Sequence, residues 1–284
     1  DFNSSANSAP AATAELPANY NRELAALAEG GRGRMVSVKP RLDIELAPLA
    51  EPMVITSEQD LDQFIAELNQ QTLISVDLET TGLASLNCQI VGWAISYDPT
   101  MVLDSNQQVD ATAGNYGAPT LKAAYIPVRH QITGDKTQLD PDLVASKLKN
   151  VLQNPAIGKI AQNAKYEINV MSLLGINFGP VVFDPMLASY IENPDNKHGL
   201  KDQSERILNY KMVKIADLIG TGRKQLTIDM VPLDSVAAYA ADDARITLEL
   251  ARYYARTLDD EQKYLLYKME LPLCAVIAKM EQTG

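Results

Sequence analysis

The sequence is poor in the residues that form disulfides, bind zinc or act as catalytic histidines. It contains two cysteines, Cys88 and Cys274, which lie far apart and form no CxxC pair, and two histidines, His130 and His198. This supply argues against a disulfide scaffold or a zinc site and leaves little material for a histidine-dependent triad. It fits a protein of a reducing, intracellular compartment.

Long apolar runs are also missing. No uninterrupted apolar run reaches the length of about 18 residues that a membrane span needs, and the N-terminus lacks the basic and apolar regions of a signal peptide. We therefore expect a cytoplasmic protein with no membrane partner. The apolar fraction of 46% over 284 residues is ordinary, so we expect a sizeable core in one large domain or in a domain with appendages.

Basic residues are outnumbered by acidic ones. The chain has 25 Lys and Arg against 36 Asp and Glu, a net charge of −11, which at face value argues against nucleic acid as a partner. The charge is uneven, however, because the window 197–224 carries seven basic and three acidic residues. A local basic patch can steer an anionic partner, although chance clustering on a solvated surface explains this window equally well.

Composition divides the chain into an arm and a folded domain. Residues 1–50 are rich in Ala, Ser, Asn and Pro and show weak hydrophobic periodicity, apart from a short helical stretch near 21–28. We expect a flexible linker there, followed by a domain over 51–260. Ser57 and Asp60 resemble a capping box before apolar residues at helical spacing.

Strand and helix signals alternate within this domain. Apolar, β-prone runs predict strands over 73–78, 89–97, 123–128 and 156–161, with a polar loop over 99–119. Proline positions and apolar spacing predict helices from Pro141, over 162–175, from Pro185 to 190, and over 199–208, 233–258 and 259–282, with a basic, mobile loop at 220–225. The pattern indicates an α/β fold that begins with an antiparallel meander.

Two acidic residues lie at the end of the first predicted strand. Asp77 and Glu79 are spaced i, i+2 after the apolar run 73–76, so both side chains share one face of the strand. Carboxylates held side by side repel each other unless a cation lies between them, and oxygen ligands suit Mg²⁺ or Mn²⁺ better than zinc. Taken alone, such a pair is more often an acidic strand end that faces water.

A further acid lies in the long predicted helix over 233–258. Tyr239 and Asp243 are spaced i, i+4, which places them on one face and within reach of a common ligand. Alanines at 237, 238, 240, 241 and 244 would let this helix approach a sheet closely. An acid buried on such a face is costly unless it is paired or bound to a metal, whereas an exposed acid would only complement the helix dipole.

Three motifs occur in the chain order of a known enzyme family. The patterns D-x-E at 77–79, N-x-x-x-acid at 163–167 and Y-x-x-x-D at 239–243 resemble the DEDD-type 3′–5′ exonucleases with a tyrosine in the third motif. The stretches most similar to the proofreading domain of family A, bacterial DNA polymerase I-like polymerases are 76–80, 125–128, 162–166, 222–227 and 239–244. The resemblance spans residues 52 to 260 and implies a ribonuclease H-like fold, a mixed five-stranded sheet flanked by helices on both faces.

The resemblance also implies roles for named residues. Two divalent ions, Mg²⁺ or Mn²⁺, would bridge the scissile phosphate at a DNA 3′ end, one held by Asp77, Glu79 and Asp243 and the other by Asp77 and Glu167. Tyr239 would orient the attacking water, and the product would be a nucleoside 5′-monophosphate. Single-stranded or frayed ends would be preferred, because unpaired nucleotides splay at the least cost. The candidates for DNA contacts are Thr80, Leu83, Gln162, Asn163, Tyr166, Lys197, His198, Arg223 and Lys224.

One position departs from the family pattern, because Glu167 stands where the family carries Asp. The extra methylene moves the carboxylate by about 1 Å or more, and a displacement of that order can cost about 10²-fold in rate. Three outcomes are open: the site adjusts, it works slowly, or the domain is a silent DNA-binding or structural module. A free-standing RNA nuclease fits less well, because similarity to the polymerase branch continues past the nuclease core.

Both ends of the chain resemble parts of a larger polymerase. Residues 269–284 are similar to the first helix of the polymerase region, so we assign 261–284 to the start of that region. The arm over 1–50 lies where a tether to a 5′-nuclease region would be. The expected partner is therefore the polymerase region of the same parent chain, in the cytoplasm near the nucleoid. We expect no polymerase activity from this chain by itself.

Overall fold

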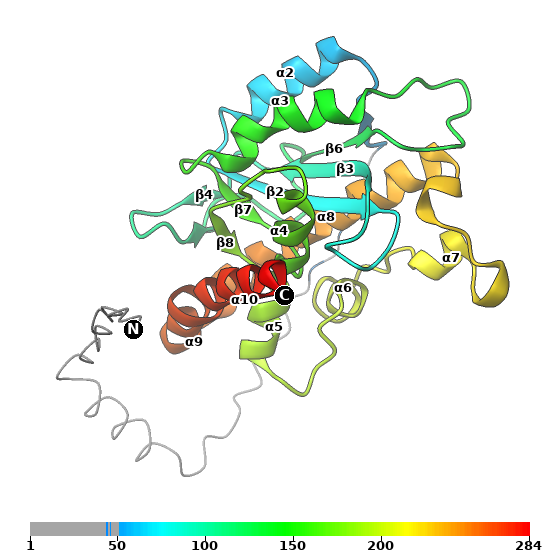
Figure 1. Cartoon of the computed structure of the whole chain (residues 1–284). Coiled ribbons are helices and arrows are strands. Elements are labelled where there is room, and N and C mark those ends of the chain that lie inside the picture. Colours follow the sequence, from blue (N-terminus) through cyan, green and yellow to red (C-terminus); the bar gives the residue numbers. More distant parts are fainter. Residues whose placement is uncertain (1–43, 45, 47–50) are drawn as a thin grey trace, which may run out of the picture. The chain divides into compact units, whose positions relative to one another are not determined.

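A mixed six-stranded sheet, in the order β1–β6–β3–β2–β7–β8, forms the centre of the fold (Figure 1). The computed structural model describes residues 44, 46 and 51–284, so the helical stretch expected near 21–28 and most of the expected arm lie outside the described residues. The strands of the sheet are β1 (Met53–Val54), β2 (Leu73–Thr80), β3 (Ile90–Tyr97), β6 (Lys122–Pro127), β7 (Gly158–Ile160) and β8 (Val181–Phe183).

The strand pairing confirms the expected meander and shows at which edge of the sheet the strand that carries Asp77 and Glu79 ends. β2, β3 and β6 pair antiparallel in sequence order, whereas β7 is parallel to β2, β8 to β7 and β1 to β6. The sheet has six strands where five were expected, because the two-residue β1 pairs with β6 at one edge. Such short strands give no periodic signal in a sequence. Because β2, β7 and β8 are parallel, their carboxyl ends meet at one edge of the sheet.

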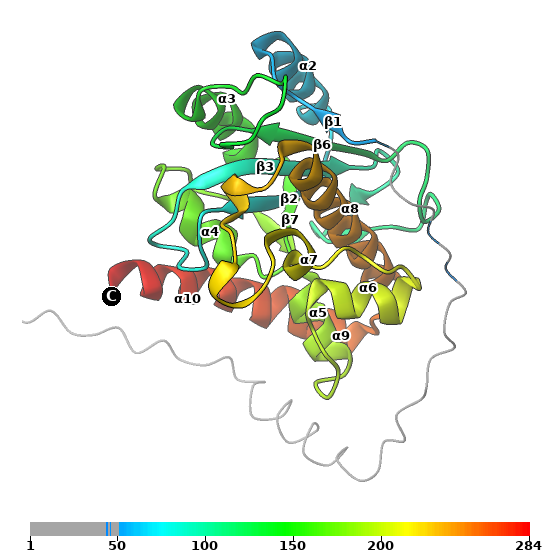
Figure 2. The same ribbon diagram turned by 90° about the vertical axis from the view of Figure 1, so that its right-hand side faces the viewer.

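Helices cover both faces of the sheet, as the sequence predicts. α2 (Glu58–Leu68) and α3 (Pro141–Gln153) lie together on one face, and α8 (Leu233–Thr257) crosses the other (Figure 2). Ile74, Val76 and Leu78 of β2 belong to the core cluster formed with α2 and α3. Since side chains alternate along a strand, Asp77 and Glu79 point towards the face that α8 covers.

The small side chains of α8 bring this helix close to the sheet. Ala237, Ala240 and Ala244 are at most 1% exposed, and they pack against Val91 and Ala94 of β3. A helix that carried larger residues on this face would stand further from the strands. The predicted helix over 233–258 is confirmed, and its alanines set the height of Asp243 above β2.

The remaining elements surround this core. They are α4 (Lys165–Ser172), α5 (Pro185–Glu192), α6 (Leu200–Leu208), α7 (Ile215–Ile219), α9 (Asp260–Leu265), α10 (Leu271–Thr283), the 3₁₀ turns η1 (Gly222–Lys224) and η2 (Ile228–Met230), and the π-helical turn η3 (Leu266–Glu270). The helix expected over 259–282 is confirmed as a continuous helical run in which η3 precedes Pro272, a residue that lacks an N–H donor. Within the described residues, no helix combines the length and apolar character of a bilayer span.

A small hairpin lies within the segment 99–119, where the sequence predicts a loop. Its strands are β4 (Val102–Leu103) and β5 (Val109–Asp110). Arg252 of α8, which is fully buried, pairs with Asp98 and Glu249 and donates to the carbonyl of Ala113 at 3.2 Å. These contacts fix both ends of the hairpin segment to α8. The sequence did not predict the hairpin, because long-range contacts hold it and local periodicity does not show them.

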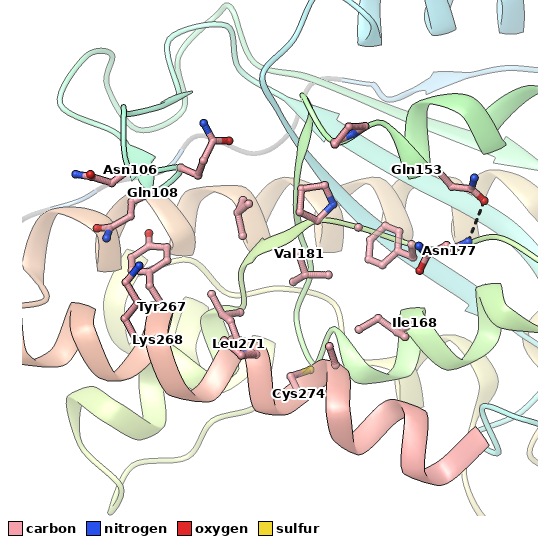
Figure 3. Close-up of a pocket in the computed structure, with 18 residues that line it drawn as sticks. Asn106, Gln108, Gln153, Ile168, Asn177, Val181, Tyr267, Lys268, Leu271 and Cys274 are labelled. Atoms are coloured by element: carbon pink, nitrogen blue, oxygen red, sulfur yellow. Dashed lines mark hydrogen bonds between the residues drawn. The ribbon is translucent and has the colours of Figure 1, made fainter. Parts of the chain in front are cut away.

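A hollow of about 560 Å³ lies between β8, the end of α3 and α10 (Figure 3). Its lining combines the side-chain amides of Gln108, Gln153 and Asn177 with apolar groups such as Leu271. None of the four acids expected in the active site lines this hollow. Its position against α4 and α10 makes it a gap between packed elements, away from the acids.

Lys159 of β7 ties the turn that precedes β7 to the backbone just before β8. The side chain is fully buried, and Nζ donates to the carbonyl oxygens of Asn154, Ile157 and Gly179, each at 2.7 Å. Buried carbonyl groups are costly to leave unpaired. Lys159 therefore fixes the strand from which the chain continues towards α4.

We expect Lys159→Met to lower the free energy of unfolding by about 2–4 kcal/mol, because three carbonyl groups lose their donor. Urea denaturation followed by circular dichroism measures this change. The matched control is Lys279→Met, which alters an exposed lysine on α10 and should shift stability by less than about 0.5 kcal/mol. Equal stabilities of Lys159→Met and the parent would contradict the assignment.

Candidate functional site

Asp77 and Glu79 of β2 share a buried environment with Asp243 of α8. Glu79 is 8% exposed and Asp243 is 7% exposed, while Asp77 is half-buried. Burial, followed by the charge of Asp243, raises the pKa of Asp77 to about 7. Burial and the charges of Asp77 and Asp243 hold the pKa of Glu79 well above its usual range. The three carboxyl groups therefore oppose one another's ionisation.

Glu167 joins these acids from the first turn of α4. It is 3% exposed, and burial, followed by the charge of Asp77, raises the pKa of its carboxyl group well above the usual range. Its Oε2 atom is buried and has no hydrogen-bond partner among the described residues. A buried carboxyl oxygen with no protein donor is the observation expected of a group that receives a ligand.

Asp184 fixes the start of α4 and so the place of Glu167. Its Oδ2 accepts from the backbone N–H of Ala164 at 2.9 Å, and its Oδ1 accepts from those of Asn163 and Met186 at 3.1 and 2.8 Å. The helix that the sequence predicts over 162–175 begins only at Lys165. Asn163 adopts a left-handed conformation with φ of 63°, and the cap position is Ala164. The carboxylate of Asp184 supplies the acceptors instead.

The C-terminal helix α10 holds the opposite side of α4. Glu281 pairs with Lys165 at 2.5 Å and accepts from Asn169 Nδ2 at 2.7 Å, and Gln282 donates to Asn169 Oδ1 at 3.2 Å. Residues 261–284, which the sequence assigns to the start of another region, thus pack directly on the helix that carries Glu167.

Lys201 is the cation that faces the acids. Its Nζ hydrogen-bonds Asp243 Oδ1 and lies 4.3 Å from the ring centroid of Tyr239. Burial, followed by the charge of Asp243, raises the pKa of the Tyr239 hydroxyl, which therefore stays protonated. Tyr239 and Asp243 lie on one face of α8, as expected, and Lys201 of α6 contacts both of them.

The loop that follows β2 is tied to α4. The hydroxyl of Tyr166 donates to the carbonyl of Gly82 at 2.8 Å and contacts the hydroxyl of Thr80. Leu83, on the same loop, is 96% exposed. Two of the residues expected to contact DNA, Thr80 and Tyr166, are therefore in contact with each other, and a third, Leu83, lies next to Gly82 on the loop that Tyr166 binds.

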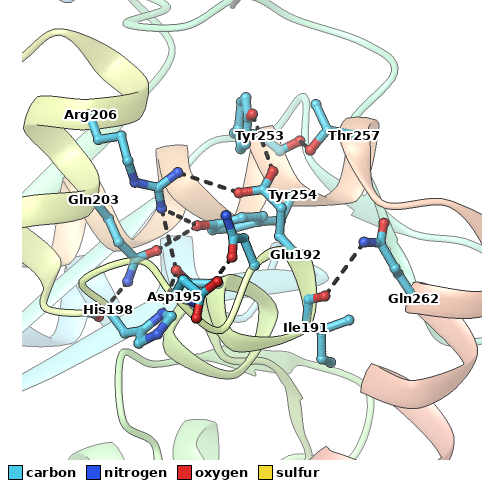
Figure 4. A network of polar contacts seen from close by, with 12 residues as sticks. Ile191, Glu192, Asp195, His198, Gln203, Arg206, Tyr253, Tyr254, Thr257 and Gln262 are labelled. Atoms are coloured by element: carbon cyan, nitrogen blue, oxygen red, sulfur yellow. Dashed lines mark hydrogen bonds and ion pairs between the residues drawn. The ribbon is translucent and has the colours of Figure 1, made fainter. Parts of the chain in front are cut away.

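A network of buried polar side chains fixes the segment before α6 (Figure 4). Gln162 and Gln203 both donate to the carbonyl of His198, at 3.0 and 2.6 Å, and Tyr254 of α8 donates to Gln203 at 2.8 Å. Gln162 Oε1 is buried and has no hydrogen-bond partner among the described residues. Gln162 is therefore held in place with a free acceptor.

The structure corrects the expected role of His198. Its Nδ1 lies 2.8 Å from Ser189 Oγ, its Nε2 lies 3.3 Å from the carbonyl of Pro194, and its ring stacks on Tyr190 with centroids 3.5 Å apart. A buried ring with both nitrogens engaged is not placed to neutralise a phosphate. The neighbouring Lys197 is exposed, with a side chain 84% accessible that lies 3.8 Å from Asp202 Oδ1, and its contact with phosphate stays a prediction.

Arg223 and Lys224 lie on η1, an exposed 3₁₀ turn where the sequence predicts a mobile loop. Figure 1 shows the segment after α7 at the periphery of the domain. Among the described residues, no hydrogen bond or ion pair joins either side chain to the four acids. Their contacts with nucleic acid stay a prediction.

The donor set fits a hard divalent cation. Four carboxyl groups supply oxygen ligands of the kind that Mg²⁺ and Mn²⁺ take, and the orphan Oε2 of Glu167 is one of them. In the described ranges, however, no three His, Cys, Asp or Glu side chains stand close enough together to hold a metal ion as they are placed. Lys201 already engages Asp243, so a ligand shell requires side-chain movement.

Sequence reasoning missed Lys201 and Asp184 as parts of this site. Lys201 lies in the first turn of α6 next to Asp202, an acid that already suits the helix dipole there. No local signal therefore connects Lys201 with Asp243. Asp184 marks the start of α5 in the sequence, but nothing local shows that it also serves α4.

A family model described as "3'-5' exonuclease" matches residues 52–259 of the chain. DNA polymerase I of Chloroflexus aurantiacus is 33% identical over 244 residues, which cover 84% of this chain and 23% of that protein. This chain spans about a quarter of the length of the curated relatives it matches.

Two solved structures show the same fold. The POL domain of Pol1 from M. smegmatis, in complex with DNA primer-template and dNTP, superposes with a TM-score of 0.56 at 18% identity over 81% of this chain and 32% of that one. Brucella melitensis NrnC with bound Mg²⁺ superposes with a TM-score of 0.54 at 15% identity over 83% of this chain and 95% of that one.

We expect Asp77→Asn to stabilise the chain in EDTA at pH 8. The pKa of Asp77 is about 7 in the folded chain against 3.8 as its ordinary value, so the folded state holds the proton more tightly. Its contribution to stability is greatest in acid and is lost as the pH rises from about 4 to about 7. A gain of about 1 kcal/mol, or roughly 2–4 °C in Tm, should appear at pH 8 and shrink at pH 5.

Thermal unfolding at both pH values measures this difference. Asp135→Asn serves as the control, because Asp135 is exposed and its removal changes the net charge equally. A lower Tm for Asp77→Asn than for the parent at pH 8 would show that the acids are not held against one another.

Proposed function

We propose, on the premise that this chain belongs to the family of 3′–5′ exonuclease domains found in DNA polymerase I, that it removes nucleoside 5′-monophosphates from the 3′ ends of DNA. The observation that supports this most is the meeting of Asp77, Glu79, Glu167 and Asp243, from three elements, in one buried acidic site beside Tyr239. Nothing in the packing of a structural module needs that arrangement, because buried acids destabilise a fold.

The acids would hold two divalent ions, Mg²⁺ or Mn²⁺. We assign Asp77, Glu79 and Asp243 to one ion, and Asp77 with Glu167 to the other. The bound ions would supply an activated water and stabilise the negative charge of the departing 3′ oxygen. The relative with bound Mg²⁺ shares the fold, and the raised pKa values of the acids reflect a cluster that a divalent cation would neutralise.

The chain's own residues would position the water and the terminal nucleotides. Tyr239 stays protonated and lies beside Asp243, so its hydroxyl can donate to the attacking water and hold it in line. Gln162 offers a buried, unpaired acceptor to a nucleotide edge, and Asn163 is exposed beside it. Tyr166 fixes the loop that presents Leu83. An apolar side chain so fully exposed can separate unpaired bases at the end of a strand.

Basic residues outside the acidic site would neutralise the DNA backbone. Lys197, Arg223 and Lys224 are exposed, and each phosphate contact adds to a salt-dependent affinity. The relatives are DNA polymerase I proteins about three and a half times the length of this chain. We therefore propose that the domain acts on single-stranded or frayed 3′ ends beside a polymerase region, in the cytoplasm.

A catalytically silent module is the second candidate. Two observations favour it: Glu167 carries one methylene more than the family's Asp, and Lys201 occupies an oxygen of Asp243. A silent domain would keep the fold and the basic surface without cleaving.

We expect the parent chain to shorten a 5′-labelled single-stranded DNA oligonucleotide from its 3′ end, one nucleotide at a time, in Mg²⁺ or Mn²⁺. Asp77→Ala should abolish the ladder, since Asp77 would serve both ions. Glu167→Asp should keep or raise the rate, by up to about 10²-fold, because it returns the carboxylate to the shorter reach. Gel electrophoresis of timed samples measures these rates.

The variants also separate the two candidates. A ladder in the parent that Asp77→Ala does not remove would indicate a contaminating nuclease. Folded protein that gives no ladder in the parent or in Glu167→Asp, with either ion, would establish the silent module. An RNA oligonucleotide of the same sequence tests the choice of DNA, which equal rates on both substrates would contradict.

A further inference from the structure

We propose that Lys201 is a built-in counter-cation, which neutralises Asp243 in the metal-free protein and has to leave this acid when a divalent ion binds. This inference rests on the proposed function, because it concerns the same acids. Its consequence is regulatory: the site is self-neutralised when empty, so the ion competes with an ammonium group of the chain.

The position of the ammonium group carries the proposal. Nζ of Lys201 contacts Oδ1 of Asp243 and lies 4.3 Å from the ring centroid of Tyr239. The side chains of Lys201 and Asp243 are 23% and 10% exposed, so solvent screens the pair only in part. A divalent ion held by Asp243 would lie beside the ammonium group that already contacts this carboxylate, and two cations at one carboxylate repel each other.

Lys201 is presented by a fixed helix and not by a loose loop. Gln203 and Ser204 of α6 are fully buried, and Gln203 bonds both Tyr254 of α8 and the carbonyl of His198 (Figure 4). The backbone of α6 is therefore anchored on two sides. The lysine side chain is long and partly exposed, so it can swing towards solvent while α6 stays in place.

The charges around Lys201 explain why this contact forms. The ammonium group also lowers the pKa of Asp77 and of Glu79 against the effect of burial, and Asp242 lies within its field. One positive charge is thus shared by the three acids Asp77, Glu79 and Asp243. It stabilises the metal-free site but does not neutralise all three carboxyl groups. A divalent ion supplies more charge at the same place and therefore displaces the lysine.

We expect Lys201→Met to bind Mn²⁺ at least about tenfold more tightly than the parent, because two unit charges in contact near a protein surface interact strongly. Electron paramagnetic resonance of the full chain, stripped of metal and titrated with Mn²⁺, gives the dissociation constants. Lys201→Arg keeps the cation and should stay near the parent. Lys211→Met is the matched control, because Lys211 is exposed, and it should change the affinity less than twofold.

Thermal unfolding supplies a second readout that a merely structural lysine would not give. Lys201→Met should have a lower Tm than the parent in EDTA, since its acids then have no counter-charge. Saturating Mn²⁺ should remove this difference, because the ion replaces the ammonium group. An equal loss of Tm with and without Mn²⁺, or an affinity for Mn²⁺ within twofold of the parent, would overturn the proposal.

The parent chain provides a test that needs no variant. Reductive methylation followed by mass spectrometry should label Lys201 slowly in EDTA and faster in Mg²⁺. This test decides the proposal even if Lys201→Met does not fold, because equal labelling rates in EDTA and in Mg²⁺ would overturn it. Failure of the parent and all variants to bind Mn²⁺ would instead overturn the proposed function together with this inference. Binding by the parent without a gain in Lys201→Met would overturn the inference alone.

Discussion

The cost of burying four carboxyl groups, together with their mutual repulsion, is the constraint on which this structure depends. Asp77, Glu79, Glu167 and Asp243 are each placed where ionisation is costly, and a fold left to its own stability would not gather them. The surrounding elements hold them together against that repulsion. This is the pattern of an active site, in which stability is given up for a charge arrangement that a ligand completes.

Each supporting element acts on the position of one acid. The small residues of α8 set the distance of Asp243 from the sheet, and Asp184 and Glu281 hold α4, with Glu167, from its two sides. Lys201 then balances part of the charge. The acids come from one strand and two helices, whereas the exposed residues that we propose as DNA contacts lie on loops and on a 3₁₀ turn, namely Leu83, Lys197, Arg223 and Lys224. Acids on regular elements and contacts on exposed segments suit the proposed cleavage of DNA of any sequence.

The sequence could predict what is written in local patterns. Alternation along 73–79 placed Asp77 and Glu79 on one face, the i, i+4 spacing paired Tyr239 with Asp243, and the family motifs connected them with Glu167. It could not predict contacts between distant segments. Lys201 and Asp243 are 42 positions apart, and Glu281 meets Asn169 across 112 positions. His198 was misassigned for the same reason, because only the folded chain shows the stacked Tyr190 and the hydroxyl of Ser189 that enclose it.

The order of the acids along the chain bears on synthesis in the cell. Asp77 emerges from the ribosome long before Asp243, since 166 residues separate them, and α8 is the element that brings Asp243 over β2. A nascent chain that lacks α8 therefore holds an incomplete set of acids and an uncovered sheet face. The proposed cleavage would therefore require α8 in place, because a chain in which α8 is missing or unfolded would lack the metal ligand proposed at Asp243. Since the acids lie far apart in the sequence, the proposed activity depends on folding of the whole domain.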